Sequence, residues 1–277
     1  MIHLFRKFTR FRALVVFILM GLALLPACSV APYRTANKSY KKQVKQYAKL
    51  LREYPVKDTF ATASNWVGAV NFNMRKPNFV IIHHTAQNSC AQTLGTFTIT
   101  RTQVSAHYVI CKDGTIFHMV NDLLRAWHGG AAKWGNLTDL NSASIGIELD
   151  NNGFETFSEP QLQSLVTLLG SLKRAFGIPA ANFIGHGDIA PTRKNDPNWR
   201  FPWKRLAENG FGLWYQEPLA EPPPSFNVPQ ALRLIGYDIK DTMAATRAFK
   251  RHFLQDSTIT PLNPMGKQVL FQMSQKY

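Results

Sequence analysis

The chain has 277 residues and a formal net charge of +15, from 32 lysines and arginines against 17 aspartates and glutamates. Hydrophobic residues make up 45 % and charged residues 18 %, which excludes wholesale disorder and leaves room for one enzyme-sized domain and one small module. Such a charge suits nucleic acid, a polyanionic wall or a membrane surface. The sequence shows no zinc finger, RNP-type strand or helix-turn-helix pattern, so we expect no nucleic-acid partner.

Residues 1–28 have the pattern of a lipoprotein signal peptide. A basic stretch ends at Arg12, and the apolar run that follows, residues 13–25, is shorter than the roughly 20 residues that span a bilayer. The run ends in Leu-Pro-Ala-Cys, which resembles a lipobox and predicts lipidation of Cys28. Because Ser29 follows this cysteine, we expect a lipid anchor on the periplasmic face of the outer membrane. An uncleaved membrane anchor is the alternative.

A basic tether, residues 29–61, follows the signal peptide. It is polar and lysine-rich, and Val44, Tyr47 and Leu51 are spaced as in a helix. Beyond the tether the sequence has two more cysteines, Cys90 and Cys111. An oxidising compartment would allow them to pair, but the sequence gives no distance between them, so both a disulfide and two free thiols stay open.

Residues 62–217 alternate between strand and helix patterns, which predicts an α/β fold with a mixed central β-sheet flanked by helices. An Asp-Gly step at 113–114 lies between two β-rich runs and predicts a hairpin. One long helix is expected after Ser158, which has Gln161 three residues on as in a capping box, and before Gly177. The predicted strands are 79–82, 106–111, 115–120, 144–149 and 182–184.

The C-terminal part begins after a proline-rich linker, residues 218–225. Residues 226–277 are expected to form a small helical module, with one helix ending at Gly236 and another across 242–253. About 50 residues is close to the lower limit for an independent core, so we expect this module to dock on the larger domain. We expect His118 and His252 to face solvent.

Polar side chains at strand ends are the candidates for chemistry. His83 and His84 end the first strand, His186 ends a later strand, and Asp196 follows ten residues on. A catalytic zinc takes three protein ligands of these types and keeps one position open. Spacing alone is weak evidence, because a histidine at a strand end is more often a core or surface group than a metal ligand.

Five motifs give these residues a context. In chain order they are residues 79–86 (FVIIHHTA), 104–110 (VSAHYVI), 126–130 (AWHGG), 144–149 (SIGIEL) and 185–197 (GHGDIAPTRKNDP). Together they resemble the type 2 N-acetylmuramoyl-L-alanine amidase family, whose fold is also that of the peptidoglycan recognition proteins. Thr192 and Asn198 stand where the family often has glycine, which puts the fit of the substrate in doubt but not the metal.

The resemblance implies a role for each matching residue. His83, His186 and Asp196 correspond to the ligands of one zinc ion per chain, Glu148 to the catalytic acid, and Lys194 to a basic residue that stabilises an oxyanion. The reaction would be hydrolysis of the amide bond between N-acetylmuramic acid and L-alanine, in peptidoglycan or in muropeptides. A structural carboxylate at Glu148 and a plain surface lysine at Lys194 are the alternatives.

Other residues of the motifs are expected to lie in a substrate cleft or to support it. They are His84, His107, Trp127, His128 and Asn141. For His107 and His128 a purely structural role stays open. The C-terminal part resembles a small three-helix peptidoglycan-binding domain, with a helical cap on the catalytic domain as its alternative.

Two other functions remain open at this point. One is a non-catalytic, wall-binding lipoprotein of the same fold, although such proteins typically lose a metal ligand and all three matching positions are intact here. The other is a zinc peptidase that cuts within the stem peptide. The sequence does not indicate an oligomeric state.

Overall fold

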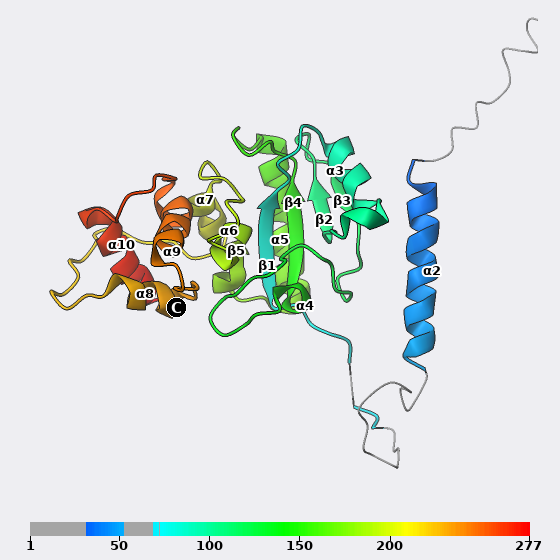
Figure 1. Cartoon of the computed structure of the whole chain (residues 1–277), viewed down its shortest axis with the longest axis horizontal. Coiled ribbons are helices and arrows are strands. Elements are labelled where there is room, and N and C mark those ends of the chain that lie inside the picture. The colour runs from blue at the N-terminus through cyan, green and yellow to red at the C-terminus, as the bar shows by residue number, and fades with distance from the viewer. Residues whose placement is uncertain (1–31, 53–68, 72) are drawn as a thin grey trace, which may run out of the picture. The chain divides into compact units, whose positions relative to one another are not determined.

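The computed structural model describes residues 32–52, 69–71 and 73–277 (Figure 1). The chain divides into two compact units, residues 1–68 and residues 69–277. In the first unit, α2 (Arg34–Leu50) forms the helix that the tether pattern predicted, and none of its residues is buried. The predicted signal peptide and Cys28 lie outside the described residues. No helix in the described ranges is long and apolar enough to cross a bilayer.

A five-stranded sheet forms the centre of the second unit, in the order β3-β2-β4-β1-β5. Every neighbouring pair is parallel except β2 and β3, which form the hairpin predicted around Gly114. The predicted mixed sheet is therefore confirmed. The strands are β1 (Phe79–His84), β2 (Tyr108–Ile110), β3 (Ile116–His118), β4 (Ser144–Leu149) and β5 (Phe183–Gly185).

One face of the sheet packs on a long amphipathic helix, α5 (Glu159–Phe176), and on α7 (Trp203–Glu208). The Ser158 hydroxyl accepts a hydrogen bond from the Gln161 N–H, and Gly177 ends the helix at φ 65°, as the sequence predicted. Leu165 and Leu169 are fully buried against aliphatic side chains of β1 and β4. This face is mainly hydrophobic, and the buried Gln161 amide donates to the Ile110 and Asp150 carbonyls.

Short helices surround the edge of the sheet near β2 and the ends of β4 and β5. They are α3 (Cys90–Phe97), α4 (Leu140–Ala143), α6 (His186–Ile189) and the 3-10 turns Thr100–Thr102 and Ala180–Asn182. A disulfide joins Cys90, the first residue of α3, to Cys111 just after β2, with 5.4 Å between their Cα atoms. Of the two possibilities that the sequence left open, a disulfide and two free thiols, the structure has the disulfide.

The C-terminal part consists of α8 (Val228–Ile235), α9 (Thr242–Phe249), a π-helical turn (Lys250–Leu254) and α10 (Pro264–Ser274). These helices lie at one end of the second unit, beyond β5 and α6 (Figure 1). Their apolar side chains share one hydrophobic cluster with Ile81, Ile184 and Ile189. The expected docking on the larger domain is observed, because the helices and the sheet have a common core.

Gly236 and His252 lie at this junction. Gly236 ends α8 at φ 131°, and a Cβ there would come within 2.6 Å of the Trp134 indole, so only glycine fits. His118 is exposed, as predicted, but the prediction for His252 was wrong: this histidine is 3 % exposed. Its ring stacks on Trp203, a contact between distant segments that helical spacing does not reveal.

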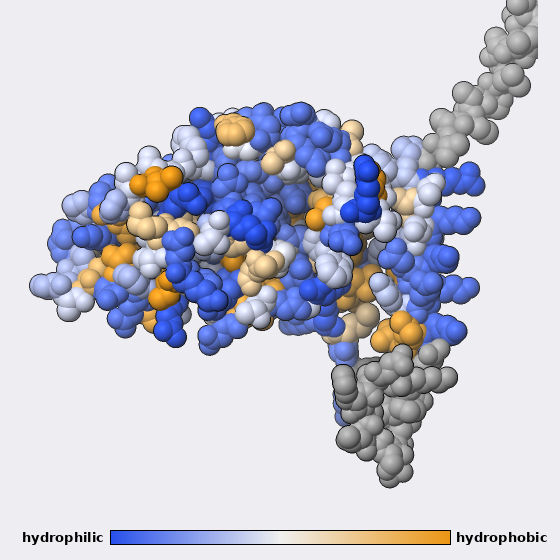
Figure 2. All heavy atoms as spheres, viewed as in Figure 1, coloured by the Kyte–Doolittle hydropathy of each residue, from blue (hydrophilic) through white to orange (hydrophobic). Residues whose placement is uncertain are grey.

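The surface of the second unit is mostly hydrophilic on the face that Figure 2 shows, with hydrophobic side chains in small spots. Exposed aromatic side chains include Trp127, Phe154 and Trp199. Trp199 follows Asp196 closely in sequence, and Trp127 directly precedes His128.

Candidate metal centre

Three predicted ligands converge at the ends of two neighbouring strands. Ile82 of β1 is paired with Gly185 of β5, so the next residues, His83 and His186, lie side by side. Their Nδ1 atoms are 2.9 Å apart, and Asp196 Oδ2 is 3.1 Å from the first and 3.0 Å from the second. All three side chains are buried. Among the described residues, no other three histidine, cysteine, aspartate or glutamate side chains meet in this way.

A hydrogen bond at Nε2 of His186 determines the protonation state of its other ring nitrogen, Nδ1, which faces His83 and Asp196. Nε2 lies 3.0 Å from the carbonyl oxygen of Gly129. A carbonyl only accepts, so Nε2 must carry the proton. The Nδ1 of His186 therefore presents a lone pair to the cluster.

A relay of hydrogen bonds sets the same tautomer at His83. The Ser144 hydroxyl donates to the Leu140 carbonyl, so its oxygen is left to accept from His128 Nε2, 3.2 Å away. His128 Nδ1 is then the acceptor for the Nε2–H of His83, at 3.1 Å. This leaves Nδ1 of His83 as a lone pair that faces the cluster.

Gly146 makes this relay possible. A Cβ at this position in β4 would lie 2.3 Å from the His128 ring, so the ring packs directly on the glycine backbone. This contact explains why the Ser-Ile-Gly-Ile-Glu motif has glycine at position 146. Any side chain there would displace His128 and break its hydrogen bond to His83.

The donor set fits a zinc ion. Two imidazole lone pairs and a carboxylate at about 3 Å repel one another, and a cation between them would turn this repulsion into attraction. Burial, followed by the nearby His186, lowers the pKa of His83 to about 4, so this imidazole is neutral at pH 7, as a metal ligand must be.

Glu148 lies beside the cluster. It is paired with His83 across β1 and β4, so both side chains project from the same face of the sheet. Its Oε2 atom is buried and has no hydrogen-bond partner. Burial and the charge of Asp196 raise the pKa of Glu148 to about 8, while the ammonium group of Lys194 acts in the opposite direction. The same ammonium group also lowers the pKa of His83, so the charge of Lys194 acts on the cluster.

Two of the predicted cleft residues, His107 and Asn141, instead form hydrogen bonds with backbone groups. His107 Nδ1 accepts the N–H of Gly146, and its Nε2 lies 3.1 Å from the Leu124 carbonyl, which ties β2 to β4. Asn141 Oδ1 accepts the backbone N–H groups of His128 and Gly129, at 3.0 and 2.7 Å. These contacts fix the loop that supplies both His128 and the carbonyl acceptor of His186.

Besides His128, the remaining cleft residues are His84, which is buried, and Trp127, which is exposed. His84 Nδ1 accepts the N–H of Asn198 at 3.0 Å, which holds the chain just after Asp196. Trp127 is 59 % exposed, with the guanidinium of Arg125 over its ring. Trp127 is thus the predicted cleft residue that is free to contact a ligand.

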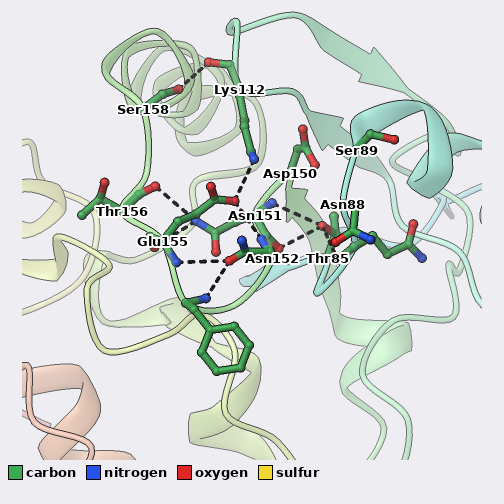
Figure 3. A network of polar contacts seen from close by, with 12 residues as sticks. Thr85, Asn88, Ser89, Lys112, Asp150, Asn151, Asn152, Glu155, Thr156 and Ser158 are labelled. Carbon is green, nitrogen blue, oxygen red and sulfur yellow. Dashed lines mark hydrogen bonds and ion pairs between the residues drawn. The ribbon is translucent and has the colours of Figure 1, made fainter.

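Sequence reasoning missed the loop after Glu148, whose polar network Figure 3 shows. The Asn151 amide donates to the carbonyls of Glu155 and Thr156, and Asn152 Oδ1 accepts the N–H of Glu155. Lys112 closes the loop by an ion pair with Glu155 at 2.7 Å. The Asn151-Asn152-Gly153 string was the available signal, since asparagines that bond nearby backbone groups are typical of tight turns.

Arg193 was also missed. Its guanidinium donates to the carbonyls of Gly129 and Ala131, at 2.9 and 2.8 Å, so it joins the chain before Asp196 to the loop beside His186. Nothing in the sequence distinguishes Arg193 from its neighbour Lys194, because the acceptor carbonyls lie some 60 residues away.

Comparison with known proteins agrees with this site. A family model described as N-acetylmuramoyl-L-alanine amidase matches residues 73–199. N-acetylmuramoyl-L-alanine amidase AmiD of Escherichia coli K12 is 32 % identical over 206 residues, which cover 63 % of this chain and 74 % of AmiD. The chain belongs to the N-acetylmuramoyl-L-alanine amidase family. A further relative of this amidase, 1,6-anhydro-N-acetylmuramyl-L-alanine amidase AmpD of E. coli K12, is 38 % identical over 108 residues, 39 % of this chain and 59 % of AmpD.

Two solved structures resemble the amidase over most of its length. E. coli AmiD, in complex with the substrate anhydro-N-acetylmuramic acid-L-Ala-D-gamma-Glu-L-Lys, has a TM-score of 0.66 at 28 % identity and covers 76 % of this chain and 93 % of its own. AmpDh3 from Pseudomonas aeruginosa has a TM-score of 0.67 at 27 % identity and covers 79 % of this chain and 99 % of its own. The predicted family, fold and enzyme class are confirmed.

Proposed function

We propose that this amidase uses one zinc ion per chain to hydrolyse the amide bond between N-acetylmuramic acid and L-alanine in peptidoglycan or muropeptides. The observation that carries the proposal is the meeting of His83 Nδ1, His186 Nδ1 and Asp196 Oδ2. The AmiD complex supports the substrate class, since its ligand contains the muramic acid–L-alanine bond.

Zinc held by these three groups would polarise the scissile carbonyl and acidify a water molecule. Glu148 would take the proton of the attacking water and return it to the leaving amine of L-alanine. Its pKa of about 8 suits this exchange, because a group that both accepts and donates a proton works best near the ambient pH. Its free Oε2 atom is available for such a bond.

Lys194 would stabilise the negative charge that develops on the carbonyl oxygen. It is half-buried, and its charge acts on both His83 and Glu148. A fixed positive group in a site shielded from water is worth about 3 kcal/mol to such a transition state. Trp127, exposed on the loop next to His128, offers a ring against which a sugar or stem peptide could pack.

The test is digestion of purified sacculi by the full-length protein, with and without chelator, followed by mass spectrometry. We expect release of stem peptides with a free L-alanine N-terminus, lost with the chelator and restored by zinc. Products cut within the stem would instead indicate a zinc peptidase. Binding to sacculi without any product, by a zinc-loaded protein, would indicate a non-catalytic wall-binding protein.

We also propose that the chain is lipidated at Cys28 and anchored at the periplasmic face of the outer membrane. The lipobox-like Leu-Pro-Ala-Cys and Ser29 support this proposal. Metabolic labelling with a fatty-acid analogue should mark the wild type in the outer-membrane fraction, but not the Cys28→Ala variant. Equal labelling of both, or neither, would contradict it.

The C-terminal helices, residues 226–277, are proposed to bind peptidoglycan in addition to their packing on the sheet. Their resemblance to a peptidoglycan-binding module supports this, and so do exposed side chains such as Leu234 and Met243 on their outer surface. Pull-down of the full chain on insoluble sacculi, compared with a Leu234→Glu variant, tests the proposal. Retention that is unchanged in the variant would argue against this surface.

A further inference from the structure

A buried carboxylate, Asp188, connects the ligand helix to the C-terminal helices. Asp188 lies in α6, two residues after His186, and is 4 % exposed. Its Oδ1 accepts the hydroxyl of Tyr237 at 2.9 Å. Its Oδ2 accepts the N–H of Gly185 at 2.8 Å and lies 2.8 Å from Nδ1 of His252. Two of these three partners come from the C-terminal helices, 49 and 64 residues away.

His252 is itself held rigidly. Its ring stacks on Trp203 with 3.9 Å between centroids and an angle of 11° between planes. Phe253 stacks against it at 4.2 Å. The ring therefore has one orientation, with Nδ1 toward Asp188, and the bond to Asp188 is set by packing.

Arg251, the neighbour of His252, closes the other side of α6. One of its guanidinium nitrogens would lie 2.5 Å from a Cβ at Gly187, so the arginine packs on the backbone next to His186. The N–H of Gly187 donates to the carbonyl oxygen of Asp196 at 2.6 Å. The segment that carries both His186 and Asp196 is thus in direct contact with the C-terminal helices.

This support matters because α6 has only four residues. A helix of one turn has no stability of its own, so tertiary contacts decide its position. His83, by contrast, lies in a strand paired on both sides, with β4 and with β5. Of the two histidine ligands, His186 is the one whose position depends on distant side chains.

We propose that Tyr237 and His252 are positioning residues of the metal centre: through Asp188 they hold His186 where its Nδ1 meets His83 and Asp196. The proposal rests on the proposed zinc function. It makes the C-terminal helices part of the catalytic centre, in addition to any role in binding the wall. Loss of either bond leaves a buried carboxylate oxygen with one partner fewer, and α6 then shifts to satisfy it.

The test uses Tyr237→Phe, which removes one oxygen, and His252→Leu, which removes the donor but keeps an apolar side chain. Zinc affinity is measured by competition with a chromophoric chelator, and kcat and KM at saturating zinc. We expect zinc to bind 10- to 100-fold more weakly in each variant, as for other residues that orient metal ligands. At saturating zinc we expect kcat to fall with KM nearly unchanged, since the substrate surface is untouched.

Two further variants separate positioning from stability. His252→Asn places an amide donor near the position of Nδ1 and should restore most of the zinc affinity that His252→Leu loses. Val269→Ala lies in the same hydrophobic cluster without contact to Asp188 and should lower the midpoint of unfolding while zinc affinity stays at the wild-type value.

The outcomes distinguish the proposal from the function on which it rests. Wild-type zinc affinity in folded Tyr237→Phe and His252→Leu, or an equal loss in Val269→Ala, would overturn the positioning role and leave the zinc function intact. If His252→Leu fails to fold, the zinc affinity of Tyr237→Phe alone tests the positioning role. A wild-type protein that binds no zinc would overturn both.

Discussion

The two faces of the central sheet are built on different principles. The face on α5 is mainly aliphatic and aromatic, with Ile145, Ile147 and Leu149 of β4 packed on Leu165 and Leu169. The opposite face carries Ser144, Gly146 and Glu148 from the same strand. Because side chains alternate along a strand, one six-residue segment supplies both the hydrophobic core and the candidate catalytic centre.

The difference shows how stability and chemistry are separated in this fold. On the α5 face, burial of apolar surface is the driving force, and the contacts are not directional. On the other face each polar group depends on a particular partner, such as His128 for His83 and His252 for Asp188. We therefore expect changes on the α5 face to affect folding, and changes to these polar partners on the site face to affect zinc binding and turnover.

The largest effect is expected from removal of a ligand. Asp196→Asn replaces a carboxylate by a neutral amide, which cannot balance the charge of a zinc ion. We expect the zinc content of the purified protein to fall close to zero, and peptide release from sacculi with it. Metal analysis and mass spectrometry of the products measure the two losses. A variant that kept both would break the distinction between the faces.

Glu148→Gln should separate binding of the metal from chemistry. The amide keeps the shape of the side chain but cannot take a proton from water. We expect kcat to fall by about 10²- to 10⁴-fold with zinc content unchanged. Retained turnover would show that another group is the base, whereas loss of zinc would show that Glu148 helps to hold the metal.

A core substitution tests the opposite face. Leu165→Ala leaves a cavity under the sheet and should lower the free energy of unfolding by about 2–5 kcal/mol. At a temperature where the variant is folded, we expect zinc affinity and kcat at the wild-type values. Urea unfolding and the kinetic assay give the comparison. A matching loss of zinc affinity would mean that the two faces are coupled.

The smallest effect concerns pH and the metal-free protein. The pKa of Glu148 is raised to about 8, so its protonated form adds stability that is complete below about pH 4.5 and is lost as the pH rises through about 8. The Glu148→Gln variant stays neutral. It should match the wild type near pH 4.5 and be more stable by at least about 1 kcal/mol near pH 9. An equal pH profile of urea unfolding for the two proteins would contradict the raised pKa.

The sequence predicted the parts of the molecule that depend on local patterns. The Asp-Gly hairpin, the helix between Ser158 and Gly177, and the mixed sheet all follow from the spacing of a few residues. The candidate ligands were found through motifs, and the parallel pairing of β1 with β5 brings His83 and His186 together. Their roles stay predictions until the variants above are measured.

What the sequence did not predict are the contacts between segments far apart in the chain. The relay from Ser144 through His128 to His83 needs a ring that packs on Gly146, and spacing in the sequence gives no such distance. The prediction that His252 faces solvent was wrong for the same reason. Its partners, Trp203 and Asp188, lie 49 and 64 residues away, outside the reach of helical periodicity.

The most direct test of the account is a crystal structure of the zinc-loaded protein with anomalous diffraction at the zinc edge. The account predicts one zinc per chain, about 2.0–2.1 Å from Nδ1 of His83 and of His186 and bound to Asp196, with the Glu148 carboxyl beside the open position. A zinc ion bound elsewhere, or through the Nε2 atoms of these histidines, would contradict it.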